Sequence, residues 1–229
     1  MKRFVIIVAG GQGARMGTAI PKQFLLMGNR PLLMRTVSLF IEKGIEVVLI
    51  LPAAHMDYWK DLCDKFGFKE SYNLVEGGCT RSDSVINGIN CVNSLANGED
   101  ALVGIHDGVR PFVSETVIES CYYAALRFGA AVPVVPIQES VRIVSYEGSV
   151  QNNRAFDRNI LRIVQTPQVF LLSILNKSYM HDYDDCPTDD ASVVEAAGFA
   201  INLVQGNYEN IKITTTADFR IALSMVSEK

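Results

Sequence analysis

The sequence predicts one α/β domain over residues 1–229, a Rossmann-like, mainly parallel sheet flanked by helices, with an inserted β-hairpin arm. Short runs rich in Val and Ile alternate with segments of helical periodicity, which is the pattern of βαβ units. The length of 229 residues is common for one such domain. No period of 20 to 50 residues recurs, which argues against a solenoid.

The expected elements follow in order along the chain. The strands are the apolar runs 4–9, 45–51, 73–75, 101–106 and 131–135. Pro31 is suited to open the helix after the first strand, and Gly44 closes it. Ser114 is suited to cap a later helix, because its hydroxyl can accept a backbone N–H of the first turn, and Gly129 ends that helix.

The pattern changes after Pro136 and predicts a two-stranded arm at about 138–160. Residues 141–146 alternate between polar and apolar, Glu147-Gly148 reads as a turn, and 149–151 begin a return strand. An isolated hairpin is only marginally stable in water. We therefore expect the arm to pack against a second copy of the chain, as a homodimer.

Composition excludes several classes of partner. The net charge of −4 supplies no basic field for a nucleic acid, so an anionic substrate must meet a few convergent cations in a pocket. No apolar stretch approaches the roughly 18 residues that cross a membrane. The five cysteines are odd in number and form no C-x-x-C, which favours a reducing, cytoplasmic location.

A glycine-rich loop follows the first expected strand. It reads Ala9-Gly10-Gly11-Gln12-Gly13-Ala14-Arg15-Met16-Gly17. Glycines let backbone N–H groups converge on an anion, so phosphate binding is the first hypothesis. The dinucleotide motif G-x-G-x-x-G does not fit, because its third position falls on Met16, and the Lys-Ser/Thr end of a P-loop is missing. The two cations Arg15 and Lys22 would suit a triphosphate. On spacing alone, the alternative stays open that both are solvated surface charges beside a structural turn.

Seven segments, in order along the chain, together resemble a known family. They are Gly10-Gly11-x-Gly13-x-Arg15-Met16-Gly17 with Pro21-Lys22-Gln23-Phe24, then Gly77-Gly78-x-x-Arg81-Ser82-Asp83-Ser84-Val85, His106-Asp107-Gly108-Val109-Arg110-Pro111, Asp157-Arg158-Asn159, Gln165-Thr166-Pro167-Gln168, Thr188-Asp189-Asp190-Ala191-Ser192 and Asn210-Ile211-Lys212-Ile213-Thr214. With them the chain resembles the sugar-phosphate cytidylyltransferases, especially the 2-C-methyl-D-erythritol 4-phosphate cytidylyltransferase family of the non-mevalonate isoprenoid pathway. The resemblance implies transfer of CMP from CTP to 2-C-methyl-D-erythritol 4-phosphate, giving 4-diphosphocytidyl-2-C-methyl-D-erythritol and pyrophosphate.

Some positions depart from that family's usual pattern and keep alternatives open. Gly10-Gly11 in the loop and the residues after Asp107 are also similar to ribitol 5-phosphate cytidylyltransferase, while 157–159 and 188–192 fit the methylerythritol enzymes better. A different class of protein, a non-catalytic nucleotide-sensing module, would keep the loop and lose the acceptor site. The presence of Arg110, Arg158 and Lys212 argues against it.

The resemblance also implies roles for individual residues. Arg15 and Lys22 would stabilise the transition state, and Arg158 and Lys212 would hold the acceptor phosphate for attack. The residues expected to bind the nucleotide are Ala9, Gly10, Gly11, Gly13, Gly77, Gly78, Ser84 and Asp107. The residues expected to bind the acceptor are Asp107, Arg110, Ser140, Arg158, Thr166 and Lys212. Because Arg158 follows the arm, it is placed to reach the site of the other subunit.

A triphosphate substrate implies Mg²⁺, held mainly by CTP oxygens, and the sequence identifies no metal ligand of its own. His106 lies beside Asp107, yet a strand histidine is more often a packed, hydrogen-bonded side chain than an acid or base. Asp189 and Asp190 fit the first turn of a helix better than a metal pair, because negative charge is favourable there.

Overall fold

The central strand of the fold, β1 (Arg3–Val8), is buried against helices on both of its faces. The structure is a computed structural model that describes residues 1–11, 20–147, 150–180 and 188–227. Within this part, eight strands form one sheet in the order β10-β7-β11-β6-β1-β4-β5, and β12 also pairs with β7. The strands beside β1 are β4 (Glu46–Leu51), β5 (Asn73–Glu76), β6 (Leu102–Asp107), β7 (Ala130–Pro136), β10 (Arg162–Val164), β11 (Gln168–Leu171) and β12 (Asn202–Gln205).

The pairings make a mixed sheet with a parallel half around β1. β1 pairs in parallel with β4 and β6, β4 with β5, and β12 with β7. β11 is antiparallel to both of its neighbours, and β10 is antiparallel to β7. Because alternate side chains of a strand point to opposite faces, Val5 and Ile7 enter one core while Phe4 and Ile6 enter the other.

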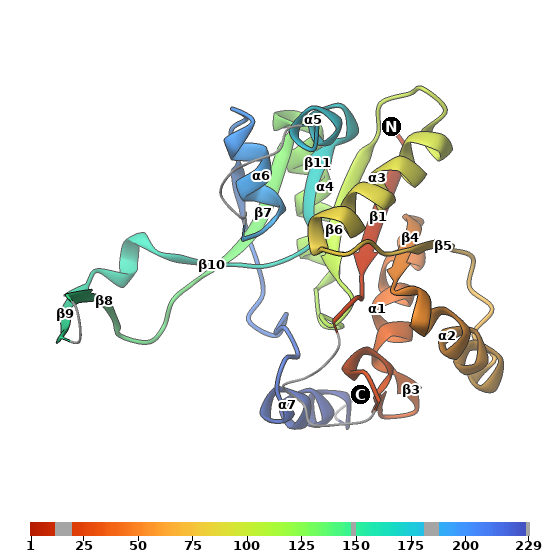
Figure 1. The fold of residues 1–229 in the computed structure, drawn as a ribbon, viewed down its shortest axis with the longest axis horizontal. Helices are drawn as coiled ribbons and strands as arrows, with labels where there is room; N and C mark the ends of the chain where they lie inside the picture. Colours follow the sequence, from red (N-terminus) through yellow and green to blue (C-terminus); the bar gives the residue numbers. More distant parts are fainter. Residues whose placement is uncertain (12–19, 148–149, 181–187, 228–229) are drawn as a thin grey trace.

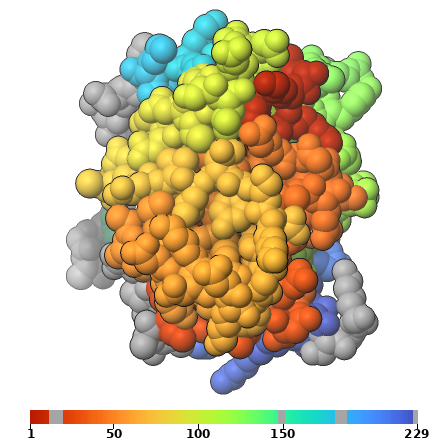
Figure 2. All heavy atoms as spheres, turned by 90° about the vertical axis from the view of Figure 1, so that its right-hand side faces the viewer, coloured from red at the N-terminus to blue at the C-terminus, as the bar shows by residue number. Residues whose placement is uncertain are grey.

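Helices cover both faces of the sheet (Figure 1). The first core lies under α1 (Leu32–Ile41), α2 (Ala53–Phe66) and α4 (Glu115–Phe128). The second core lies under α3 (Arg81–Ala96), α5 (Leu172–Ser178) and α6 (Asp190–Ala196). Seen from the β5 edge, α2 and α3 cover the sheet in orange and yellow (Figure 2). None of the helices within the described ranges is both long and apolar enough to cross a membrane.

A third, smaller apolar cluster sits beside the main sheet. There α7 (Thr216–Ser227) packs against the short hairpin of β2 (Leu26–Met27) and β3 (Arg30–Pro31), which follows the 3-10 turn η2 (Lys22–Phe24). Val109 and Ile213 belong to this cluster, and the Ile213 N–H donates to the Val109 carbonyl at 3.1 Å. The cluster therefore ties the segment after β6 to the segment that leads into α7.

The arm is a separate two-stranded ribbon that projects from the sheet (Figure 1). β8 (Val141–Glu147) runs antiparallel to β9 (Val150–Phe156), with Val141 opposite Phe156, and the 3-10 turn η3 (Arg158–Ile160) leads back to β10. The predicted hairpin is thus present, although the middle of its turn lies outside the described residues. Side chains of Ile143, Val144 and Tyr146 are exposed on it.

The predicted strands and caps agree with the structure, whereas three strands of the main sheet and the short hairpin of β2 and β3 were missed. Each of the five expected strands is found within one residue of its expected ends. The Ser114 hydroxyl accepts the Val117 N–H, as expected of the cap of α4, and Gly129 ends that helix with a φ of 89°. β10, β11 and β12 were not predicted, because runs of three or four residues are too short to show a period.

Candidate active site

Four loops meet at the carboxyl ends of the parallel strands. β4 lies on one side of β1 and β6 on the other, so the connections diverge here, and ligands of α/β sheets bind at such a point. Ala9 to Gly11 follow β1, Pro52 follows β4, Gly77-Gly78 follows β5, and Asp107 ends β6.

The glycine-rich segments line a cavity of about 360 Å³, which we call the loop cavity. Its lining residues are Val8, Ala9, Gly10, Gly11, Lys22, Gln23, Ile50, Pro52, Gly77, Gly78, Cys79, Thr80, Arg81, Ser84, Asp107, Val109 and Lys212. Every described residue expected to bind the nucleotide is in this set. Gly13 and Arg15, which were also expected here, lie outside the described residues.

The start of α3 explains why Gly78 must lack a side chain. Thr80 and Asp83 form a capping box, in which each side chain accepts the other's backbone N–H. This box brings Asp83 so close that a Cβ on Gly78 would lie 2.2 Å from the Asp83 Cβ. The Gly78 N–H donates to the Ser84 hydroxyl at 3.1 Å, and that hydroxyl donates to the Thr80 carbonyl at 2.9 Å. The segment expected to bind the base is therefore held rigidly against the helix.

A second cavity of about 290 Å³, the polar cavity, adjoins the first. It is lined by Arg81, Asp107, Arg110, Val164, Gln165, Thr166, Gln168, Thr188, Asp189 and Lys212. Arg81, Asp107 and Lys212 line both cavities. The structure thus brings Arg110, Thr166 and Lys212, three of the residues expected to bind the acceptor, to one side of Asp107.

Asp107 holds two cations at this junction. Its carboxylate pairs with Arg110 Nε at 3.0 Å and with Lys212 Nζ at 3.1 Å. Burial alone would raise the pKa of Asp107, but the charges of Lys212 and Arg110 outweigh it and lower the pKa to about 2. Asp107 is therefore ionised at neutral pH. Arg110 is further fixed by donating to the Asn210 carbonyl at 2.7 Å, while 45% of the Lys212 side chain stays exposed to the cavities.

His106, in β6, links the loop after Asp107 to the loop that carries Thr166. Its Nε2 lies 3.1 Å from the Arg110 carbonyl, which can only accept, so Nε2 carries the proton and Nδ1 accepts from the Thr166 hydroxyl at 3.0 Å. The Asp107 N–H donates to that same hydroxyl oxygen at 3.2 Å. Burial lowers the pKa of His106 to about 4, so the ring is neutral. The expectation of a packed, satisfied histidine is confirmed.

Arg81 belongs to the segment 77–85, and the sequence predicted no role for it. The structure places it at the junction of the two cavities. Its guanidinium makes a bidentate pair with Asp190, at 2.8 and 2.5 Å, and Asp190 is fully buried. Tyr179 donates to the same carboxylate at 2.7 Å. Asp189 caps α6 by accepting the Ser192 N–H, so the predicted helix start is confirmed. Arg81 and Asp190 lie 109 residues apart, and no local pattern shows that they meet.

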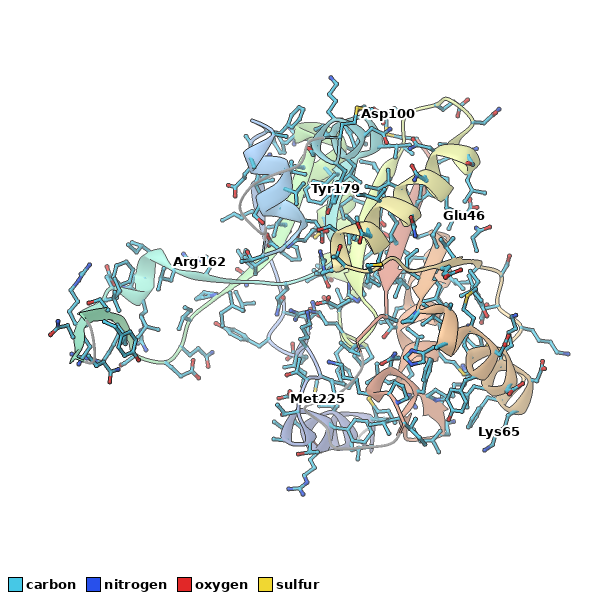
Figure 3. All side chains as sticks on the ribbon, in the orientation of Figure 1. Glu46, Lys65, Asp100, Arg162, Tyr179 and Met225 are labelled. Atoms are coloured by element: carbon cyan, nitrogen blue, oxygen red, sulfur yellow. The ribbon has the colours of Figure 1, made fainter. Side chains whose placement is uncertain are left out.

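Arg158 and Ser140 do not line either cavity of the described chain. Arg158 lies in η3, at the base of the arm, where its guanidinium donates to the Gln138 carbonyl. Figure 3 shows nearby Arg162 on the connection to the arm, far from Tyr179 in the body of the molecule. Within one chain, these two predicted acceptor residues are not brought to the site around Asp107.

Known proteins resemble this chain in sequence and in fold over nearly its whole length. A family model described as IspD, 2-C-methyl-D-erythritol 4-phosphate cytidylyltransferase, matches residues 4–228. The enzyme of that name from Phocaeicola vulgatus is 49% identical, over 97% of this chain and 98% of its own. The one from Bacteroides fragilis is 44% identical, over 99% and 100%. The solved structure of the Thermus thermophilus enzyme is 30% identical, covers 99% of this chain and 100% of its own, and has a TM-score of 0.76.

The chain belongs to the 2-C-methyl-D-erythritol 4-phosphate cytidylyltransferase family. Membership confirms the predicted fold class, and it confirms the prediction of a nucleotidyltransferase that performs CTP-dependent cytidylyl transfer in isoprenoid biosynthesis. The ribitol 5-phosphate alternative and the non-catalytic sensing module are not favoured, since the matched family and these relatives all carry the methylerythritol name.

The described residues of the loop cavity offer few ligands for a metal ion. In the described ranges, no three His, Cys, Asp or Glu side chains come together as a metal site. Asp107 is the one carboxylate among the described residues that line the loop cavity, and two cations already pair with it. A magnesium ion at this place would therefore depend mainly on phosphate oxygens.

Proposed function

We propose that CTP binds in the loop cavity, that the phosphate of 2-C-methyl-D-erythritol 4-phosphate binds in the polar cavity, and that the reaction takes place where the two meet. The observation that carries this proposal is that Arg81, Asp107 and Lys212 line both cavities. One side of the junction offers glycine backbone for a nucleotide, and the other offers side-chain donors and a cation for a phosphate.

The acceptor phosphate attacks the α-phosphorus of CTP. A new bond forms between an acceptor phosphate oxygen and the α-phosphorus, the bond from the α-phosphorus to the bridging oxygen breaks, and pyrophosphate leaves with that electron pair. A phosphate monoester has a second pKa of about 6, so it is already largely dianionic and needs no general base. The state of His106 supports this route, because the ring is neutral, buried and engaged through both nitrogens.

Positive charge on both sides of the junction supplies the stabilisation that such a transfer needs. Lys22 lines the glycine-rich side, close enough that a Cβ on Gly11 would contact its Cε at 3.7 Å. Arg110 stands on the other side and Lys212 at the junction itself, both oriented by Asp107. Cations fixed in advance lower the barrier because charge builds up on the α-phosphate in the transition state. Arg15, which lies outside the described residues, keeps its proposed place beside Lys22.

We propose Mg²⁺ as the ion that accompanies CTP, where it would neutralise part of the triphosphate charge. Asp107 is the described residue positioned to offer it an oxygen. A cytoplasmic location is also proposed, supported by the free thiols of Cys63, Cys79, Cys91 and Cys121.

The arm supports a proposed homodimer in which Arg158 and Ser140 serve the partner's polar cavity. β8 and β9 pair only with each other in the described sheets, and a two-stranded ribbon alone is marginal. Apolar side chains along and just after it are exposed, including Tyr146 at 69% and Ile160 at 70%. A second copy would bury these side chains and bring its site to the base of the arm.

Pyrophosphate release tests the activity and the acceptor. With CTP, Mg²⁺ and 2-C-methyl-D-erythritol 4-phosphate, turnover is expected, and ribitol 5-phosphate should give little. Lys22→Ala should mainly lower kcat, because its contact strengthens in the transition state. Lys60→Ala, on the exposed face of α2, is the matched control and should behave as wild type. An unchanged kcat with only a raised KM for CTP would remove Lys22 from the catalytic role.

Subunit mixing tests whether Arg158 acts across the dimer. Lys22→Ala and Arg158→Ala are each expected to be nearly inactive. If Arg158 reaches the partner's site, a mixed dimer of the two variants contains one site with both residues intact, and activity returns on mixing. If Arg158 acts within its own chain, each site lacks one residue and mixing restores nothing. A fully active monomer in light scattering would refute the dimer itself.

A further inference from the structure

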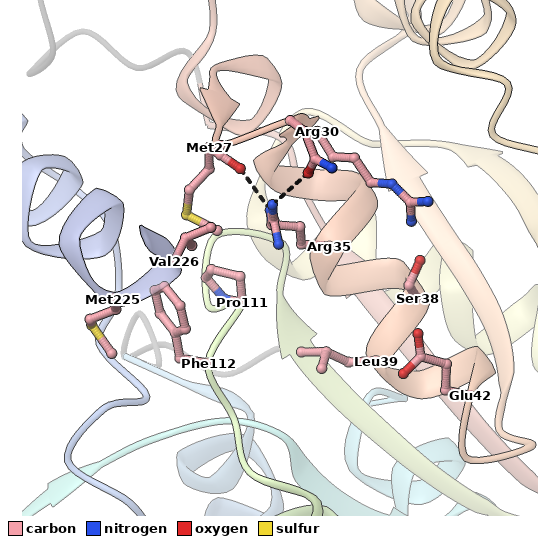
Figure 4. Close-up of a pocket in the computed structure, with 12 residues that line it drawn as sticks. Met27, Arg30, Arg35, Ser38, Leu39, Glu42, Pro111, Phe112, Met225 and Val226 are labelled. Carbon is pink, nitrogen blue, oxygen red and sulfur yellow. Dashed lines mark hydrogen bonds between the residues drawn. The ribbon is translucent and has the colours of Figure 1, made fainter. Parts of the chain in front are cut away.

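A cavity of about 650 Å³ lies away from the two described above and shares no lining residue with them (Figure 4). It is bounded by α1, the turn between β2 and β3, the segment after Arg110, and the end of α7. Its lining residues are Met27, Gly28, Asn29, Arg30, Arg35, Ser38, Leu39, Glu42, Pro111, Phe112, Met225 and Val226. The volume is within the roughly 300–1,000 Å³ of small-molecule sites. We call it the α1 cavity.

Two arginines face this cavity, and neither has a carboxylate partner among the described residues. Arg35 is held by neutral groups, since its Nε donates to the Met27 carbonyl at 2.8 Å and its Nη2 donates to the Asn29 side-chain oxygen at 2.9 Å (Figure 4). In the described part of the chain neither Arg30 nor Arg35 forms an ion pair, although Glu42 also lines the cavity. Burial, and then the charge of Arg30, lowers the pKa of Arg35. An anion bound between the two arginines would offset the repulsion between their positive charges.

A buried hydroxyl points to a ligand independently of these charges. Ser38 is only 6% exposed, and its Oγ finds no hydrogen-bond partner among the described residues. A buried hydroxyl without a partner is energetically unfavourable, because it has given up its hydrogen bonds to water. Ser38 lines the α1 cavity one helical turn after Arg35. Its hydroxyl is thus a donor at the wall of the cavity that no described residue satisfies.

The opposite wall is apolar. Pro111, Phe112, Met225 and Val226 form it, and Figure 4 shows Phe112 and Val226 facing the side on which Arg35 lies. A purely polar anion would leave these side chains against water. A ligand with an apolar body would cover them and gain the free energy of burying that surface.

We infer that the α1 cavity binds a small alkyl phosphate, with its phosphate group against Arg30, Arg35 and Ser38 and its apolar chain against Phe112 and Val226. Guanidinium groups and a hydroxyl donor match the several acceptor oxygens of a phosphate. The site goes beyond the proposed cytidylyl transfer, because none of its residues lines either cavity of the active site.

Isothermal titration of the full chain with n-octyl phosphate, below its micelle concentration and with CTP saturating, tests the inference. One molecule per chain should bind, and inorganic phosphate or 1-octanol alone should bind at least tenfold more weakly. Arg30→Gln, at an exposed residue, should weaken binding about tenfold, since a charge-assisted hydrogen bond is lost. Ser38→Ala should weaken it several-fold. Arg220→Gln, an equal charge change on exposed α7 outside the cavity, should leave binding unchanged.

Three results would overturn the site. The first is no saturable binding of octyl phosphate while CTP is bound. The second is binding that both Arg30→Gln and Ser38→Ala leave unchanged although circular dichroism shows both variants folded. The third is association only with vesicles that contain phosphatidic acid, which would assign the two arginines to a membrane surface. Because binding is read directly, these results stay separate from any failure of cytidylyl transfer.

Discussion

Replacing Asp107 by Asn removes the charge that orders Arg110 and Lys212 at the junction of the two cavities. The carboxylate is 12% exposed and pairs with both cations within 3.1 Å. Asn keeps the size of the side chain and one acceptor oxygen but carries no negative charge to attract the two cations. The substitution therefore measures how much of the folded state's stability depends on this ionised group.

The pKa of Asp107 sets the size of the effect. It falls from an ordinary 3.8 to about 2 in the folded chain. Since a pKa difference of one corresponds to about 1.4 kcal/mol, the ionised carboxylate stabilises the fold by about 2 kcal/mol. Because the folded pKa is the lower one, this stability is fully present above pH 4 and is lost as the pH falls through about 2.

Urea unfolding followed by circular dichroism checks this value. At pH 7, Asp107→Asn should lower the free energy of unfolding by about 2 kcal/mol. The difference from wild type should stay constant down to about pH 4 and shrink below it. Asp57→Asn removes an ion pair whose carboxylate is 94% exposed, and it should change stability by less than about 0.5 kcal/mol. A loss at pH 7 no larger than that of Asp57→Asn, or one that persists unchanged at pH 2.5, would refute the reasoning.

Three other substitutions test parts of the site that the fold holds in place. The pKa of His106 is about 4, below its ordinary 6.5. The free energy of unfolding of the wild type should therefore fall by about 3 kcal/mol as the pH is lowered from 6.5 to 4. In urea titrations, His106→Gln should lose most of this pH dependence. In Gly78→Ala the new methyl group would clash with Asp83 and displace the segment expected to bind the base, so KM for CTP should rise more than tenfold in initial-rate assays. An unchanged KM would show that the loop accommodates the methyl group. Arg81→Met removes the cationic partner of the buried Asp190 and should lower the free energy of unfolding by about 3–5 kcal/mol. A loss under about 1 kcal/mol would contradict the importance of this ion pair for stability.

Much of the parallel half of the fold follows from local sequence. The run 4–9 is apolar throughout because β1 is buried on both faces, and the alternation of 141–146 reflects a ribbon with no core of its own. Ser114 and Gly129 could be assigned as helix ends because capping uses only neighbouring backbone groups. These features depend on contacts within a few residues, so a single sequence shows them.

The other half of the sheet needed tertiary structure. β11 inserts between β6 and β7 and runs antiparallel to both, which a βαβ pattern does not predict. β10 has three exposed residues, so no burial pattern marks it. Their places are decided by the hydrogen bonds that neighbouring strands offer, not by their own composition.

The active site divides in the same way. The glycine-rich loop with Lys22, and the motifs around Asp107 and Lys212, were visible in the sequence, because each needs particular residue types at a short spacing. Only the folded chain brings Asp107 to Lys212 across 105 residues, and Arg81 to Asp190 across 109, since both contacts depend on which strands are neighbours. Local chemistry thus determined which groups this protein uses, and strand order decided which of them act together.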